Sequence, residues 1–252
     1  MGVFLTLIFI TAFLNNPSQK ALLVFMLSLI SAVCADLLFV RLRGVKPFFP
    51  SGSLVTGSII GLLTSPDLSW YVPIVISIIA MFSKNFIRLS NRHIFNPAGF
   101  GLLVGAIIFG YNISWWGVSF QRLDIHHLQS IIYFLILLSP ALISVLRMRR
   151  YRIILSFLIT YTFINAVLDP KFTILNSFFD PTILFFSLVM LPEPMTTPNN
   201  HKRQVIFGIF VALFSIFSSY PISNFKFQIS NLSVDPLIFA LLLGNLVFLR
   251  FR

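Results

Sequence analysis

The sequence has few charged residues, and very few of them are acidic. Charged residues make up 10% of its 252 positions, with seven Asp and Glu against 18 Lys and Arg. A soluble domain carries roughly a quarter charged residues, so this chain lacks the polar surface that water requires. Hydrophobic residues reach 57%, and the mean hydropathy is +0.93. These values exclude a water-soluble domain and predict a protein that crosses the membrane many times.

Cysteine and tryptophan are almost absent as well. The single cysteine, Cys34, lies in an apolar run, which excludes a disulfide framework and a cysteine-ligated metal or cluster. We expect Cys34 to be a small buried side chain. The 30 Phe against three Trp indicate lipid-facing and packing surface more than an aromatic binding site.

The net charge of +11 raises the question of nucleic-acid binding. The basic residues lie in short clusters between apolar runs, and no basic face with interleaved aromatic residues is present. Clusters of this kind are typical of the cytoplasmic loops of membrane proteins. We therefore expect contact with the lipid bilayer and no contact with nucleic acid.

Ten apolar segments follow one another along the chain. A transmembrane helix needs about 20 residues, and several of these segments are shorter. We expect some of the short ones to be half-helices or re-entrant helices buried in the protein. The ten segments are Val3–Leu14, Ala21–Val40, Ser51–Thr64, Trp70–Arg88, Asn96–Gly110, Leu128–Leu146, Ile153–Leu168, Pro181–Leu191, Val205–Tyr220 and Pro236–Leu249.

The distribution of Lys and Arg tests the number of crossings. If all ten segments cross and the first loop lies outside, fourteen of the 18 Lys and Arg fall on one side. This positive-inside pattern predicts a multi-pass protein of the cell membrane with both termini in the cytoplasm. The fourteen residues are Arg41, Arg43, Lys46, Lys84, Arg88, Arg92, Arg147, Arg149, Arg150, Arg152, Lys202, Arg203, Arg250 and Arg252, and the other side holds Lys20, Arg122, Lys171 and Lys226.

Ten crossings divide into two halves of five, at residues 1–112 and 113–252. An odd number of crossings in each half inverts the second half relative to the first. The sequence thus predicts a single membrane domain of the all-α integral membrane class, built as a 5+5 inverted repeat with short, broken helices.

Helix starts recur at equivalent places in the two halves. Asn96-Pro97 in the first half, and Asp180-Pro181 and Asp235-Pro236 in the second, each combine a capping side chain with Pro at the first helical position. This combination is a favourable helix N-terminus. Ser51-Gly52 is a looser fourth start in the first half.

Two of the short segments, Ser51–Pro66 and Asp180–Pro198, are interrupted by small residues or proline. Such segments at matching positions of two halves are the best sequence indication of a buried site in a membrane protein. A half-helix start presents backbone N–H groups that favour an anion or a carbonyl group. Hydroxyl groups and unwound carbonyls suit a cation or the polar edge of a ring. Glycines Gly52, Gly57 and Gly61 permit close approach of either a ligand or a neighbouring helix.

Three of the seven acids border the short segments. Asp180 and Asp235 suit either helix capping or a functional role, and their depth in the membrane decides between the two. Glu193 lies between two prolines in LPEPMTTP and is the strongest candidate, because a residue there has no capping role. We expect Asp36 to pair near Arg41 at the membrane interface. The remaining acids, Asp67, Asp124 and Asp169, are predicted to lie in outer loops.

No catalytic set of a soluble enzyme is present. The sequence has no phosphate-binding loop, dinucleotide-binding motif or nucleophile elbow. The four histidines, His93, His126, His127 and His201, lie at loop positions without the spacing of metal ligands on a helix, and the pair His126-His127 is expected to be solvated. We therefore predict no catalytic residue and no metal ligand.

Three stretches of the sequence resemble one protein family. They are SGSLVTGSIIGLL from Ser51, HIFNPAGFGLLVG from His93 and MLPEPMTTP from Met190. They resemble RnfD, a membrane component of the Rnf electron-transport complex, and its relative NqrB, a membrane component of the sodium-pumping NADH:quinone oxidoreductase. The resemblance extends over roughly residues 40 to 250.

This resemblance implies a ten-helix inverted-repeat fold like that of urea channels, partner membrane subunits and bound flavin. The family carries FMN covalently on a threonine in an outer S-G-A-T-type loop, and a second flavin among the helices. This sequence has no such motif, and its outer loop NISWWGVSFQRLD has no threonine. We therefore expect non-covalent FMN or riboflavin. The candidate cofactor-binding residues are Ser51, Gly52, Ser53, Thr56, Gly57, Asn96, Pro97, Asp180, Glu193, Thr196, Thr197 and Asp235.

Three hypotheses for the function follow. The leading one is a flavin-linked electron-transfer membrane subunit, with movement of Na⁺ or H⁺ as a candidate coupled process. The alternative is a channel or transporter for a small polar solute, whose pathway passes between the third and eighth segments and is lined by Glu193 and the Ser51–Thr56 region. The third is an assembly scaffold for partner subunits. Bound flavin distinguishes the first hypothesis, and solute flux without a redox partner distinguishes the second.

Overall fold

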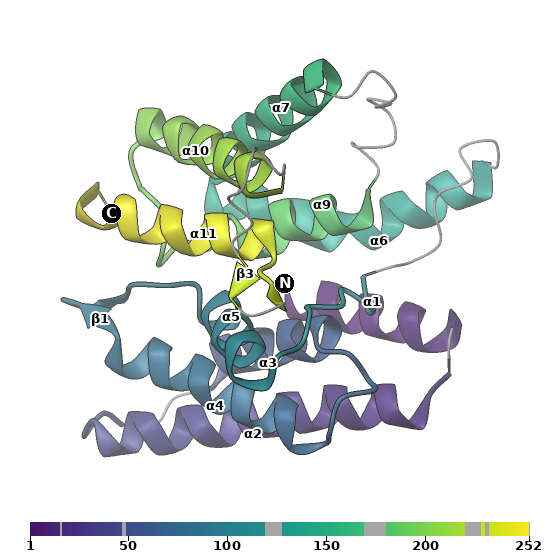
Figure 1. Cartoon of the computed structure of the whole chain (residues 1–252), viewed down its shortest axis with the longest axis vertical. Coiled ribbons are helices and arrows are strands. Elements are labelled where there is room, and N and C mark those ends of the chain that lie inside the picture. The colour runs from purple at the N-terminus through teal and green to yellow at the C-terminus, as the bar shows by residue number, and fades with distance from the viewer. Residues whose placement is uncertain are drawn as a thin grey trace. The chain divides into compact units, whose positions relative to one another are not determined.

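The computed structural model describes residues 1–15, 17–46, 49–118, 128–168, 180–219, 228–229 and 232–251, and most of these residues are helical. The all-α class is thereby confirmed, and the helices lie close to the predicted segments. In the first half they are α1 (Gly2–Asn15), α2 (Gln19–Leu42), α3 (Ser51–Leu63), α4 (Tyr71–Phe86) and α5 (Pro97–Phe109) (Figure 1). In the second half they are α6 (Leu128–Met148), α7 (Tyr151–Leu168), α9 (Pro181–Phe185) with the π-helix η1 (Phe186–Met190), α10 (His201–Ser219), α11 (Pro236–Val247) and the 3₁₀ turn η2 (Leu249–Phe251).

Two short β-hairpins accompany the helices. One joins β1 (Arg88–Leu89) to β2 (Arg92–His93), and the other joins β3 (Gln228–Ile229) to β4 (Leu232–Ser233). Each hairpin comes directly before a short helix that begins with proline, α5 in the first half and α11 in the second.

Helix length supports an integral membrane protein. Among the described residues, α2, α7 and α10 are long and apolar enough to cross a membrane. Helices α1, α3, α4, α5 and α11 are also apolar but have only 12 to 16 residues. A helix of 16 residues is about 24 Å long, against a hydrocarbon core of about 30 Å. The number of ten crossings therefore stays a prediction.

The chain forms two compact units. The N-terminal unit comprises Gly2–Val118 and Gln228–Asp235, and the C-terminal unit comprises Ser119–Phe227 and Pro236–Arg252. Each unit has its own core of large apolar side chains, which includes Phe4, Ile60 and Ile76 in the first and Phe157 and Phe207 in the second.

Helix α2 organises the N-terminal unit. It runs parallel to α4, as two hydrogen bonds between the helices show. Ser77 Oγ donates to the Ser28 carbonyl (3.1 Å), and further along both helices Asn85 Nδ2 donates to Asp36 Oδ1 (2.9 Å). It runs antiparallel to α3, where Gly57 lies against Ser28 and Leu29. A Cβ atom on Gly57 would come within 2.8 Å of the Leu29 Cα atom, so glycine is required for this close approach.

Helix α5 completes this unit by packing antiparallel on α4. Its Gly101 lies against Ala80, and its Gly105 lies against Ile76 one turn earlier in α4. The small residues of the predicted segments therefore serve helix packing at these positions.

The C-terminal unit has the same pattern of directions. Helices α7 and α10 run parallel, since Arg150 contacts Pro198 and Asn199 just before α10, and Gly208 lies against Ile153 further along. Helix α11 runs antiparallel to α10.

Two contacts establish the direction of α11. Gly244 lies against Val211, and the Phe248 ring lies 5.4 Å from the Phe207 ring, so the end of α11 approaches the start of α10.

One prediction about the core is wrong. Cys34 is exposed, because the buried stripe of α2 runs through Ser28, Ala32 and Asp36 and leaves Cys34 beside it. The neighbouring exposed residues of α2 include Met26 and Ile30, so Cys34 belongs to an apolar face suited to lipid.

Candidate functional site

The first of the two short, interrupted segments begins as expected at Ser51, where α3 starts with Pro50 in the N-cap position. Ser53 Oγ donates to the Pro50 carbonyl (2.9 Å), and Thr56 Oγ1 donates to the Gly52 carbonyl (2.9 Å). The hydroxyl hydrogens of Ser53 and Thr56 are therefore used within the helix, whereas their oxygen lone pairs can still accept a hydrogen bond. Ser53 and Thr56 are buried, and Ser51 and Gly52 are exposed.

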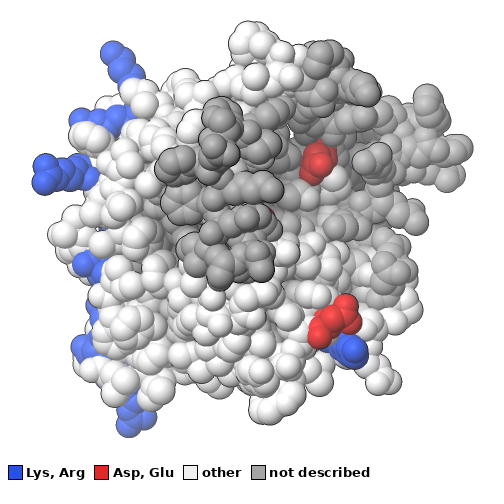
Figure 2. All heavy atoms as spheres, viewed as in Figure 1, with Lys and Arg blue, Asp and Glu red and all other residues white. Residues whose placement is uncertain are grey.

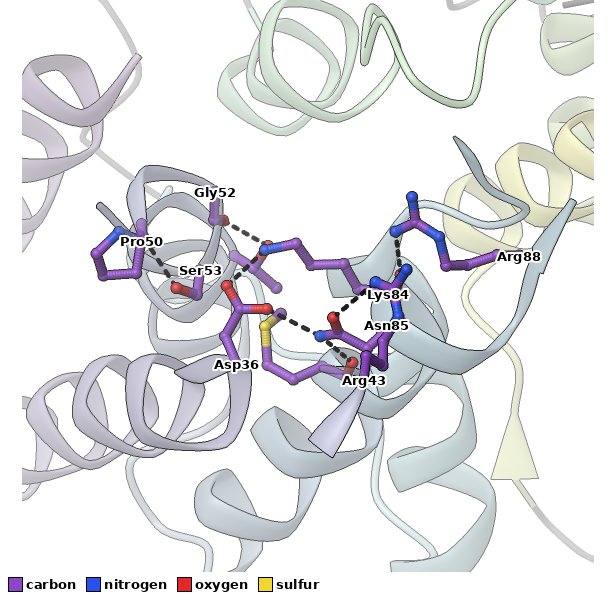
Figure 3. Close-up of polar contacts among 10 residues, drawn as sticks. Asp36, Arg43, Pro50, Gly52, Ser53, Lys84, Asn85 and Arg88 are labelled. Carbon is purple, nitrogen blue, oxygen red and sulfur yellow. Dashed lines mark hydrogen bonds and ion pairs between the residues drawn. The ribbon is translucent and has the colours of Figure 1, made fainter. Parts of the chain in front are cut away.

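A buried ion pair lies beside this helix start. Lys84 Nζ is 2.7 Å from Asp36 Oδ2, and the side chains are 17% and 3% exposed. Asn85 Nδ2 donates to the other oxygen, Asp36 Oδ1 (2.9 Å), so both carboxylate oxygens have a partner. The Lys84 ammonium also reaches the first turn of α3, because a Cβ atom on Gly52 would lie 3.3 Å from it (Figure 3).

This pair corrects the prediction for Asp36. The expected partner was Arg41 at the membrane interface, but the carboxylate is buried between α2 and α4 and pairs with Lys84. The sequence did contain a signal, because Asp36 and Lys84 both lie within apolar segments. An ionisable residue inside a membrane segment is expensive to bury and is a functional candidate for that reason.

Two arginines surround the pair. Arg43 Nη1 donates to Asn85 Oδ1 (3.4 Å), and Arg88 Nη1 donates to the Lys84 carbonyl (3.1 Å) (Figure 3). Partial burial, together with the nearby charge of Arg43, lowers the pKa of Arg88, which lies beyond the end of α4. Lys84 thus pairs directly with the Asp36 carboxylate, and the two arginines are held around the pair through Asn85 and the Lys84 carbonyl.

The other end of α3 is closed by a loop. The last carbonyl groups of a helix have no partner within the helix, which is costly inside a membrane. Here Trp116 Nε1 donates to the Gly61 carbonyl (3.0 Å), and the Gly117 N–H donates to the Leu62 carbonyl (3.0 Å). The Ser114 N–H donates to the Leu63 carbonyl (3.1 Å). The loop after α5 therefore allows α3 to end without reaching water.

Asp235 lies in the same unit as this loop. Its Oδ2 atom accepts a hydrogen bond from Trp115 Nε1 at 2.7 Å. Trp115 is buried and has a positive φ of 51°, a backbone conformation that is strained for a bulky residue. Asp235 therefore helps to hold a strained turn next to the end of α3, a role that its position before Pro236 did not predict.

The two other predicted helix starts are capped. Asn96 Oδ1 accepts from the Gly99 N–H (3.0 Å) at the start of α5, where Pro97 is the first helical residue. Asp180 Oδ1 accepts from the N–H groups of Thr182 (2.8 Å) and Ile183 (3.1 Å) at the start of α9. Capping thus accounts for one oxygen of each side chain.

The second short segment changes its winding partway along. Helix α9 continues at Phe186 as the π-helix η1, which ends at Met190. Such π-turns inside a helix occur frequently at functional sites. The chain then leaves the helix and enters the stretch Leu191–Asn200.

Three predicted site residues come together in this stretch. Thr196 Oγ1 donates to Glu193 Oε2 (3.1 Å), and Thr197 Oγ1 donates to the Glu193 carbonyl (2.7 Å). Both threonines are fully buried, and Glu193 is partly buried. The prolines on either side of Glu193 remove two backbone donors, so these hydroxyl groups form the local structure.

Two residues that the sequence did not single out hold the same stretch. Arg150 donates to the Pro198 carbonyl and to Asn199 Oδ1 (2.7 Å), and it is buried. Asn245 of α11 is also buried and donates to the Thr196 carbonyl (3.3 Å). Arg150 gave no signal because it belongs to a cluster of basic residues, whereas an Asn within the apolar run ALLLGNLVFL could have been noticed.

The predicted site residues therefore belong to both units. Ser51, Gly52, Ser53, Thr56, Gly57, Asn96, Pro97 and Asp235 belong to the N-terminal unit, and Asp180, Glu193, Thr196 and Thr197 belong to the C-terminal unit. Asp124, Asp169, His126 and His127 lie outside the described residues. Among the residues that the structure describes, no three His, Cys, Asp or Glu side chains gather as metal ligands would, and His93 is buried in β2.

Apolar helices with polar, internally satisfied ends define an integral membrane protein with short, interrupted helices. The model of the NQR2, RnfD, RnfE family matches residues 1–129 of the chain, which is just over half of its length. The chain belongs to this family of membrane subunits of Rnf- and Nqr-type complexes. The match confirms the resemblance, although it begins at residue 1 and ends before the MLPEPMTTP stretch. A search of curated proteins found no match.

Proposed function

We propose that this chain is a flavin-linked electron-transfer subunit of an Rnf- or Nqr-type complex in the cell membrane. The family match over residues 1–129 carries this proposal. Partner membrane subunits would supply the electron donor and acceptor, and movement of Na⁺ or H⁺ would be the coupled process. Both termini would face the cytoplasm.

We infer that the two halves, 1–112 and 113–252, form a 5+5 inverted repeat. Two features support the correspondence. In the N-terminal unit, α2 and α4 are parallel and α5 is antiparallel to α4. In the C-terminal unit, α7 and α10 are parallel and α11 is antiparallel to α10. In each half, a hairpin with two-residue strands precedes the last short helix, α5 or α11.

The charges of the N-terminal unit support the proposed orientation. Two of its three acids among the described residues lie at opposite ends of α2, with Asp36 near the end of the helix and Asp67 next to Lys20 at its beginning (3.8 Å). The other six Lys and Arg residues among this unit's described residues lie in or after the last turns of α2 and α4, namely Arg41, Arg43, Lys46, Lys84, Arg88 and Arg92. A membrane protein with this segregation places the six cations in the cytoplasm.

The flavin in this proposal is non-covalent FMN or riboflavin. A flavin ring supplies one- and two-electron redox chemistry, and the protein supplies binding and a polar environment. The residues proposed to hold it are the twelve predicted from the sequence. Three observations support this set. Gly52 has no side chain in the first turn of α3, and Ser53 and Thr56 keep lone pairs that can accept hydrogen bonds. Thr196 and Thr197 are oriented by hydrogen bonds to Glu193.

Titration of the purified full-length protein with riboflavin and FMN tests this proposal. We expect saturable quenching of flavin fluorescence, weakened about tenfold or more by Thr196→Val, because the loss of a buried hydroxyl disturbs the Glu193 stretch at a cost of about 1–3 kcal/mol. Thr6→Val is the matched control, since Thr6 is exposed on α1.

Two results would contradict the proposal. One is the absence of saturable binding for either flavin. The other is flux of a small polar solute through liposomes that contain this protein alone, which would favour the alternative of a channel or transporter.

A further inference from the structure

The end of the N-terminal unit where α2 and α4 finish is strongly basic. Arg41 lies in the last turn of α2, and Arg43 and Lys46 follow it. Lys84 lies in the last turn of α4, and Arg88 and Arg92 follow it. Among the described residues of this end, Asp36 supplies the single negative charge, and it is buried. In Figure 2, blue Lys and Arg atoms lie along the lower part of the left edge, where β1 and the ends of α2 and α4 lie in Figure 1.

Three of these cations are held in fixed positions. Lys84 is anchored to Asp36, Arg43 donates to Asn85, and Arg88 donates to two backbone carbonyls, those of Lys84 and Asn91. Mutual repulsion of Arg43 and Arg88 contributes to the lowered pKa of Arg88. Like charges gathered around one buried carboxylate are unfavourable unless an additional anion compensates them.

The surface next to these cations is apolar. The Phe39 ring packs edge-on against Phe82 (6.3 Å between centroids) and Phe86 (5.4 Å), within one turn of Asp36 and Lys84. Phe82 is 48% exposed and Phe86 is 45% exposed, and Leu38 and Leu42 of α2 are exposed as well. Cationic side chains therefore border an exposed apolar helix face.

We propose that this basic end, defined by Arg43, Lys84 and Arg88, is a binding site for the headgroup of an anionic phospholipid. The guanidinium groups match the geometry of a phosphate, with two parallel N–H donors each. The acyl chains would lie on the exposed face formed by Leu38, Phe82 and Phe86. A lipid fits both parts of the surface, whereas an acidic protein segment would use the charges and leave the apolar face uncovered.

The experiment offers the purified full-length protein an equimolar mixture of phosphatidylglycerol and phosphatidylcholine with identical acyl chains. After the protein is isolated again, mass spectrometry measures the ratio of the two retained lipids. A cation near a membrane surface is worth about 1 kcal/mol towards an anionic lipid, which corresponds to about fivefold in binding. We expect phosphatidylglycerol to be enriched, and Arg43→Gln/Arg88→Gln to lower the enrichment at least about fivefold.

The matched control is Arg147→Gln/Arg149→Gln, which removes two exposed cations of the C-terminal unit and should leave the enrichment unchanged. Enrichment should also fall as salt concentration rises, which the unmodified protein tests without any substitution. Equal retention of both lipids by the unmodified protein would overturn the proposal. Three other results would also overturn it. They are an equal loss of phosphatidylglycerol enrichment in the two double variants, unaltered enrichment in high salt, and displacement of the lipid by inorganic phosphate alone.

Discussion

A carboxylate such as Asp36 is stable inside an apolar bundle only while both of its oxygens have partners. Lys84 and Asn85 supply them, at 2.7 and 2.9 Å. The attraction within a buried pair roughly offsets the cost of removing the two charges from water, so its net contribution to stability is small. Loss of one partner is different, because it leaves the other charge buried and alone.

Asp36→Leu should therefore destabilise the protein strongly, by about 3–5 kcal/mol. Thermal unfolding in a neutral detergent, followed by circular dichroism, measures the change. Adding Lys84→Met to the same protein should restore a large part of the lost stability, since the double variant has no unpaired charge. A double variant less stable than Asp36→Leu alone would contradict the role of the pair. Asp67→Leu is the control, because its pair with Lys20 is exposed.

At the residue scale, the sequence identified candidates better than it identified partners. Glu193 was singled out from the prolines on either side of it, and Thr196 and Thr197 as hydroxyl-bearing residues of the same motif, and the three are joined by hydrogen bonds. Arg150, which holds that stretch, could not be distinguished from its basic neighbours, because its burial depends on where the 194–199 backbone folds back. Partners distant in sequence are set by tertiary packing, which a local pattern does not contain.

At the scale of helices and strands, the start and end points followed from local chemistry. Proline at the first position and Asn or Asp before it predicted the starts of α5, α9 and α11, and all three are confirmed. The hairpins and the π-helix η1 were not predicted. A two-residue strand is too short to show a periodic pattern in the sequence. A short π-helix depends on the packing of the surrounding helices, which a local pattern does not contain.

Helix α3 offers a test of close packing with two glycines on one helix. Gly57→Ala should destabilise the protein by about 1–3 kcal/mol, because the new Cβ would meet the α2 backbone at 2.8 Å and push the helices apart. Gly52→Ala should cost much less, since its Cβ would meet only the end of the Lys84 side chain, at 3.3 Å, and Ala favours a helix over Gly by about 1 kcal/mol. Thermal unfolding of both variants makes the comparison. An equal change of stability in both variants would contradict the proposed close packing of α3 on α2.

At the scale of the whole molecule, charge distribution predicted the orientation in the membrane. A cysteine-labelling experiment checks it, starting from Cys34→Ala to remove the single natural thiol. A membrane-impermeant maleimide should label Asp67→Cys in intact cells. It should label Asn91→Cys and Lys202→Cys only after the membrane is opened, because these positions lie on the basic, cytoplasmic side. Labelling of Lys202→Cys in intact cells would contradict the inverted orientation proposed for the second half.

The sequence also predicted the family, which the match over residues 1–129 confirms. The resemblance rested on short motifs around Ser51, Asn96 and Glu193. The resemblance also implies flavin, and a short motif does not specify which side chains hold the ring. Bound flavin is therefore the property that most needs a direct measurement.

That measurement is the visible absorbance spectrum of the purified protein before and after acid precipitation. We predict the flavin bands in the native protein, and their complete transfer to the supernatant after precipitation, because the chain has no S-G-A-T-type threonine for covalent attachment. Flavin that remains in the precipitate would contradict non-covalent binding. A protein that shows no flavin bands after mild extraction and addition of both FMN and riboflavin would contradict the proposed function itself.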